Sequence, residues 1–199
     1  MTKNANSVIL PPMDAKLPIC FRKQLLENLH LDRGNISTLI TNSEVFKDLP
    51  KKHGYPTAYK VRDVFILMLA DELLELNQPF RAVDLLICRL DKKHIGKILV
   101  DERMHINDRS ILLVSRAGDI TLPPGKVLLR TVRQRGIGAV ILTIIPEAEF
   151  LKTFKAYREA YRAHTVIKLY QILEDIHILV RKIPDEVKLS LLQNYTQEK

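Results

Sequence analysis

Five aliphatic residues near the start of the chain constrain its fold more than any other feature. They are Leu25, Leu29, Leu31, Ile36 and Leu39. The first two are four residues apart and the last two are three apart, steps that place side chains on one helical face. The pattern predicts a helix-turn-helix, two short helices packed at a steep angle, the first beginning near residue 19. Asp32 is placed to cap the second helix, which we expect at about 33–43.

The rest of the N-terminal half divides at its proline-rich and polar segments. Residues 1–18 are rich in Asn and Pro and predict an irregular arm. Residues 47–60 carry Pro and Gly and do not favour a helix. Residues 61–76 predict an amphipathic helix, and a shorter helix is expected at 80–90. The composition then changes, and we expect a domain boundary near residue 93.

The C-terminal half, 94–199, predicts an α/β domain for dimerisation or effector binding. Its apolar runs indicate strands at 109–116, 120–122, 126–134 and 138–145. A long helix is expected at 146–182 and a terminal helix at about 184–195. Apolar residues recur at three- and four-residue steps along the long helix, namely Phe150, Phe154, Tyr157, Tyr161, Ile167, Tyr170, Leu173, Ile176 and Val180. This stripe could pack on the sheet of the same chain or on a second subunit, and we expect a homodimer. The predicted fold class is α+β, mainly α.

Charge and composition limit the partners. Lys and Arg total 31 against 23 Asp and Glu, a net charge of +8, which indicates an anionic partner such as nucleic acid. With no Trp and 6% aromatic residues, a platform for stacking sugars or single-stranded bases is not expected. No apolar run approaches the ~20 residues of a membrane span, and no secretory signal is recognisable, so we expect a cytoplasmic protein. Cys20 and Cys88 are expected to be small buried residues rather than a disulfide.

The segments after the helix pair follow an order known from one family. They are Lys51-Lys52-His53-Gly54-Tyr55, then Tyr59, then Val61-Arg62-Asp63-Val64, then Leu73-Leu74-Glu75-Leu76-Asn77. This order resembles the winged helix-turn-helix of the MerR family of transcriptional regulators, over about residues 19–90. Asn77 stands where the family usually has Gly, and His30 occupies a turn position that favours a small residue. The second helix reads ISTLITN and lacks the family's common Arg-Tyr-Tyr run.

The resemblance implies a regulator that binds double-stranded DNA, with the second helix in the major groove. The polar residues expected to contact bases or phosphates there are Arg33, Asn35, Ser37, Thr38, Thr41 and Asn42. Arg and Asn can make paired hydrogen bonds to guanine and adenine. The wing expected on the flanking backbone carries Lys51, Lys52, His53, Tyr59 and Lys60. Phosphate contacts of this kind contribute affinity but little sequence information.

Two other classes of function stay open. The helix pair could mediate protein contacts in a structural or assembly protein. The C-terminal half could be a nucleotide or small-ligand sensor, or an enzyme. The glycines are not spaced as in a phosphate-binding loop, and the six histidines show no paired metal spacing. We therefore expect no catalytic residues, no cofactor and no metal.

Overall fold

The computed structural model describes residues 18–29, 31–47, 49, 57–76, 80–90, 110–117, 129–134, 137–152, 155 and 161–196. It is an α+β fold, mainly helical, with two small antiparallel sheets, which confirms the predicted class. The N-terminal elements are β1 (Pro18–Phe21), α1 (Arg22–Asn28), α2 (Arg33–Asn42), the short 3-10 helix η1 (Glu44–Phe46), β2 (Ala58–Lys60), α3 (Val61–Glu75) and α4 (Phe80–Leu90). The C-terminal elements are β3 (Ser110–Ala117), β4 (Leu129–Gln134), β5 (Ile137–Pro146), the 3-10 helix η4 (Glu147–Glu149), β6 (Tyr161–Lys168), α7 (Leu169–Lys182) and α8 (Asp185–Thr196).

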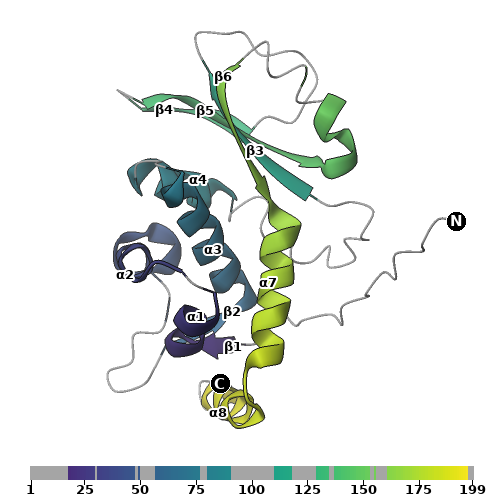
Figure 1. Ribbon diagram of the computed structural model, residues 1–199. Coiled ribbons are helices and arrows are strands. Elements are labelled where there is room, and N and C mark those ends of the chain that lie inside the picture. The colour runs from purple at the N-terminus through teal and green to yellow at the C-terminus, as the bar shows by residue number, and fades with distance from the viewer. Residues whose placement is uncertain are drawn as a thin grey trace, which may run out of the picture.

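Helix α3 is the centre of the molecule (Figure 1). All residues from Asp63 to Asp71 are buried, so the helix is covered on every side rather than on one face. This corrects the expected amphipathic helix. The run VFILMLA leaves no polar face in the middle of α3, and a helix that is apolar all round is stable only when other elements enclose it. Helices α2, α4 and α7 pack around it.

Helices α1 and α2 form where the spacing predicts two helices. Leu25, Ile36 and Leu39 are fully buried, and Leu29 and Leu31 pack against the same core. The Asp32 side chain accepts a hydrogen bond of 2.7 Å from the backbone N–H of Asn35 and so caps α2. A cap of this kind typically contributes about 1 kcal/mol.

A two-stranded sheet lies beside the pair. Strands β1 and β2 are antiparallel, with Phe21 opposite Ala58. The segment 18–21 is therefore a strand, not the end of an arm or the first turn of a helix, and α1 begins at Arg22. Pro18 opens this strand, a position where its missing N–H removes little from the ladder. Residues 1–17 lie outside the described residues.

The second sheet has four antiparallel strands in the order β4-β5-β3-β6. Strands β3, β4 and β5 confirm three of the predicted strands, and 120–122 lies outside the described part of the chain. Strand β6 corrects the expected helix over 146–182. Its aromatic and apolar residues follow helical spacing, but Thr165, Val166 and Ile167 are β-branched, and β3 offers a full edge of backbone hydrogen bonds.

Strand β6 continues directly into α7, which packs on α3 and also touches α1. The stripe of α7 that was expected at a sheet or dimer interface therefore lies in the core of its own chain, through Ile172, Ile176 and Leu179. Leu112 and Ile167, opposite each other on β3 and β6, join the same cluster. One core thus draws on residues from both sides of the predicted boundary near residue 93.

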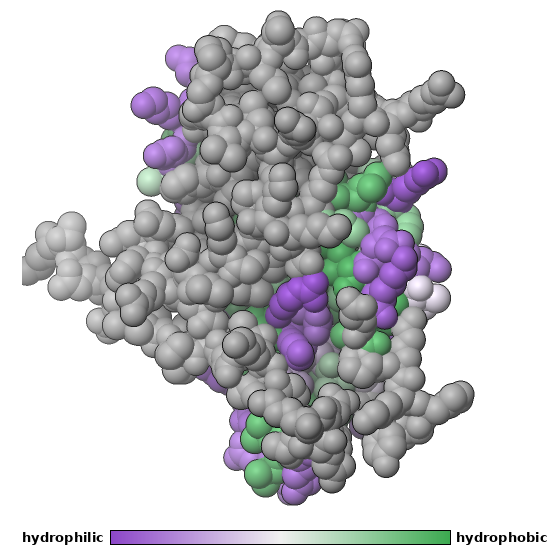
Figure 2. Space-filling view, turned by 180° about the vertical axis from the view of Figure 1, so that it is seen from behind, coloured by the Kyte–Doolittle hydropathy of each residue, from purple (hydrophilic) through white to green (hydrophobic). Residues whose placement is uncertain are grey.

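Helix α8 confirms the predicted terminal helix and packs against β1. Its outer face mixes polar and apolar side chains at the lower end of the molecule (Figure 2), and Leu189 is 60% exposed. Among the described residues, no helix has the length and apolar character that crossing a membrane requires.

The placement of α7 predicts a contrast between two isoleucines on that helix. Ile176 is fully buried and Ile178 is 47% exposed. We expect Ile176→Ala to lower the free energy of unfolding by about 2–5 kcal/mol, because it leaves a cavity beside α3. Ile178→Ala should change it by less than about 0.5 kcal/mol. Urea unfolding followed by circular dichroism measures both, and equal losses would contradict the packing of α7 on α3.

Candidate nucleic-acid interface

Helix α2 lies on the side of α3 opposite α7 (Figure 1), away from the C-terminal helices. Its inner face packs into the core through Ile36 and Leu39. Four of the predicted contact residues are exposed on the rest of the helix, namely Arg33, Thr38, Thr41 and Asn42. The structure therefore leaves a polar face of α2 open to a partner.

Asn35 does not belong to that face. Its side-chain Nδ2 donates a 3.1 Å hydrogen bond to Oδ1 of Asp71 on α3, and Asp71 is only 3% exposed. The backbone N–H of Asp32 approaches the other oxygen of the same carboxylate at 3.4 Å. The expectation that Asn35 faces a base is corrected, because a buried carboxylate must be satisfied by hydrogen bonds and this amide supplies one. Asn35 fixes the start of α2 against α3.

Ser37 lies on the other flank of α2 and is half-buried. Its hydroxyl accepts a 2.5 Å hydrogen bond from Nη2 of Arg22, the first residue of α1. The two flanks of α2 are thus joined to two different helices, to α3 through Asn35 and to α1 through Ser37.

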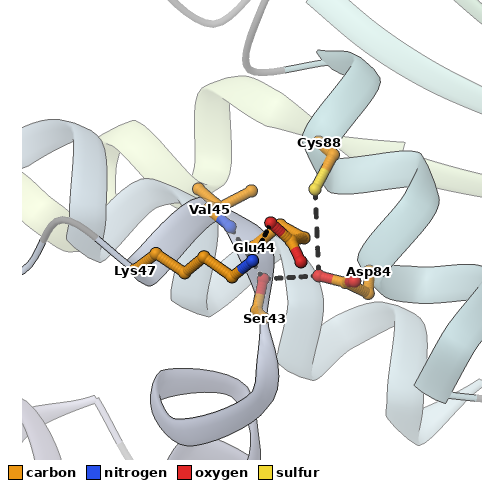
Figure 3. A network of polar contacts seen from close by, with 6 residues as sticks. All are labelled: Ser43, Glu44, Val45, Lys47, Asp84 and Cys88. Carbon is orange, nitrogen blue, oxygen red and sulfur yellow. Dashed lines mark hydrogen bonds and ion pairs between the residues drawn. The ribbon is translucent and has the colours of Figure 1, made fainter.

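The end of α2 is held by α4 (Figure 3). Ser43, which is buried, donates a 2.5 Å hydrogen bond from Oγ to Oδ1 of Asp84 and accepts one of 3.3 Å from the N–H of Val45. The thiol of Cys88, one turn along α4, lies 3.8 Å from the same Asp84 oxygen. Sequence reasoning missed this contact, because Ser43 and Asp84 are far apart in the chain and neither belongs to a short motif.

The position of Tyr59 corrects a second expectation from the sequence. It was expected on the DNA backbone, but its side chain points into the core from β2 and is 1% exposed. Burial raises the pKa of its hydroxyl to about 12, although the positive charge of Arg22 acts to lower this pKa. Side chains alternate along a strand, so the neighbouring Lys60 points outward and is exposed.

The start of α3 carries a buried carboxylate, Asp63, which the sequence analysis named only as part of the family-like residue order. Asp63 accepts a 3.0 Å hydrogen bond from the backbone N–H of Lys60 and a 3.1 Å contact from Arg62. Burial raises the pKa of this carboxyl, while the Lys60 and Arg62 contacts oppose the shift. An acidic residue in the first turn of a helix was the available signal.

The remaining wing residues, Lys51, Lys52 and His53, lie outside the described residues. These residues precede β2 in the chain. Strand β2 begins at Ala58, which pairs with Phe21, the residue before α1. Within the parts of the chain described, no group of three or more His, Cys, Asp or Glu could hold a metal ion. The alternative of a sensor or enzyme in the C-terminal half stays a prediction, since most side chains of β3–β6 are also outside the description.

Comparison of the chain with protein-family models, with curated proteins and with solved structures gave no match. The resemblance to the MerR family therefore depends on the residue order and spacing given above.

The contact between Asn35 and Asp71 predicts an asymmetry between two asparagines of α2. We expect Asn35→Ala to lower the free energy of unfolding by about 1–3 kcal/mol, because it removes a donor from a buried carboxylate. Asn42→Ala, at the exposed end of the same helix, should change stability by no more than about 0.5 kcal/mol. Thermal and urea unfolding measure the difference, and a neutral Asn35→Ala would show that Asp71 does not hold α2.

Proposed function

We propose that this protein is a transcriptional regulator that binds double-stranded DNA sequence-specifically, with α2 in the major groove. The observation that carries the proposal is the contrast between the two sides of α2. Its inner side is buried through Ile36 and Leu39, and polar contacts of Asn35, Ser37 and Ser43 join it to neighbouring helices, while Arg33, Thr38, Thr41 and Asn42 remain exposed. An α-helix fits the major groove of B-DNA, where each base pair presents a distinct pattern of donors and acceptors.

The exposed residues supply the chemistry for reading bases. Arg33 can donate two hydrogen bonds to the O6 and N7 of guanine, and Asn42 can pair with adenine. The hydroxyls of Thr38 and Thr41 can bond to bases or phosphates, and their methyl groups can contact thymine. At 100° per residue, Thr38 and Thr41 lie near the middle of the outer half of α2, and Arg33 and Asn42 lie at its two edges.

The contacts that hold α2 on its neighbours support the same function energetically. A helix already held at its start, its middle and its end loses little conformational freedom on binding. The entropy cost of ordering it therefore offsets less of the interaction energy. The exposed Lys60, together with Lys51, Lys52 and His53 of the predicted wing, would contact phosphates beside the groove. The resemblance of residues 19–90 to the MerR family supports this arrangement.

A protein-contact role for the helix pair fits the surface of α2 less well. The buried centres of protein interfaces are enriched in aromatic, Met and Arg side chains. Of these types the open face of α2 presents only Arg33, beside Thr38, Thr41 and Asn42. These residue types favour a nucleic acid as the partner.

We also propose that the protein acts as a homodimer in the cytoplasm, because paired half-sites multiply a weak single contact. The buried face of α7 is occupied by α3 and cannot supply the interface that the sequence stripe predicted. Light scattering at micromolar concentration tests the dimer, and a monomeric mass would contradict it.

Binding to DNA is tested by selecting duplexes from a random pool and measuring Kd for a selected and a mixed-sequence duplex. We expect affinity to fall steeply with salt, because bound cations are released from the phosphates. Arg33→Ala should weaken binding to the selected duplex by about 1–3 kcal/mol and affect the mixed duplex less.

Arg181→Ala is the matched control, because it removes the same charge from the exposed end of α7, on the opposite side of α3. It should leave both affinities unchanged. Failure to enrich any sequence, or binding that does not respond to salt, would refute the proposed function. Equal losses for the two arginine variants would refute the placement of α2 in the groove.

A further inference from the structure

Arg22 is an exposed cation that the proposed base contacts do not use. It is the first residue of α1, and its Nη2 donates to the hydroxyl of Ser37 on α2 at 2.5 Å. The interaction joins two residues that are 15 positions apart in the chain. It fixes a side chain that would otherwise lose considerable rotamer freedom when it bound a ligand.

Arg22 directly follows β1 of the two-stranded sheet, and its guanidinium contacts α2. Phe21, the residue before it, pairs with Ala58 of β2. The charge of Arg22 also acts on the Tyr59 hydroxyl, where it lowers the pKa against the effect of burial. The guanidinium thus contacts α2 directly and acts electrostatically on Tyr59 of β2.

Other cations near Arg22 each lie beside a carboxylate that neutralises their charge. Lys23 lies 4.0 Å from Glu27, Lys47 lies 2.5 Å from Glu44, and Arg62 lies 3.1 Å from Asp63. The partner found for Arg22 within the described chain is the neutral hydroxyl of Ser37. A guanidinium carries five N–H donors in a rigid fork, so one bond to Ser37 leaves the others available to an anion.

We propose that Arg22 binds a phosphate of the DNA backbone and that Ser37 is the positioning residue that orients its guanidinium. This inference deepens the proposed function and rests on it. A phosphate is the group that a planar fork of donors recognises best, since two of its oxygens can accept parallel hydrogen bonds. Ser37, predicted to contact DNA directly, then acts through Arg22.

The test uses the full chain and measures Kd for the selected and the mixed-sequence duplex across a series of KCl concentrations. Arg22→Ala should weaken both duplexes by a similar factor and reduce the slope of log affinity against log salt by about one, as expected for one lost phosphate contact. Lys23→Ala, the adjacent exposed cation paired with Glu27, is the control and should leave the slope unchanged.

Three further variants separate a phosphate contact from a structural role. Arg22→Lys should keep the salt slope and lose affinity, because an ammonium keeps the charge but not the fork. Ser37→Ala should weaken binding of both duplexes. The double variant Arg22→Ala with Ser37→Ala should be no weaker than Arg22→Ala alone, because the hydroxyl acts through the arginine. Circular dichroism of each variant confirms that its helices are intact.

The outcomes distinguish this inference from the function on which it rests. If the unsubstituted protein shows no salt-dependent binding of either duplex, the proposed function fails and the assignment of Arg22 fails with it. If it binds and Arg22→Ala leaves the salt slope unchanged, the phosphate assignment alone is overturned. A loss confined to the selected duplex would overturn it as well, because Arg22 would then read a base. Additive losses in the double variant would overturn the role of Ser37.

Discussion

Burial of α3 on all sides is the constraint on which the rest of the structure depends. From Asp63 to Asp71 this helix has no residue open to water, and each fully buried Leu, Ile, Phe or Met contributes about 1.5–3 kcal/mol relative to exposure. The helix pair, α4 and α7 cover it from different sides, and the four-stranded sheet reaches the same core through Leu112 and Ile167. The candidate DNA-binding helix therefore has a fixed place because it is one wall around α3.

Two carboxylates of α3 set the orientation of the elements around it. Asp63 near one end receives the N–H of Lys60 and so joins β2 to the helix, and Asp71 nearer the other end receives Asn35 of α2. Hydrophobic packing is non-directional, whereas a buried carboxylate needs donors in defined positions. The apolar side chains thus hold α2 on α3, and the hydrogen bonds determine which of its residues face outward.

The sequence was sufficient to predict the two helices of the candidate site, but only part of the contacts that their side chains make. The spacing of Leu25, Ile36 and Leu39 was sufficient to place both helices, because helical periodicity is a local property. The roles of Asn35, Ser37 and Tyr59 were not predictable in this way, since each depends on a partner or a neighbour from a distant segment. Arg22 was not recognised for the same reason, because its partner Ser37 is found only once α1 and α2 pack together.

The sequence alone determined the helices with strong periodicity, the apolar strands, the cap at Asp32 and the positive charge, all of which depend on residues close together in the chain. Tertiary structure decided whether 161–168 became helix or strand, because the edge of β3 offered backbone hydrogen bonds to a segment whose own pattern allowed both. It also decided that the apolar face of α7 serves the core of its own chain, and which polar residues of α2 turn inward. These outcomes depend on contacts between distant segments, and such contacts exist only in the folded chain.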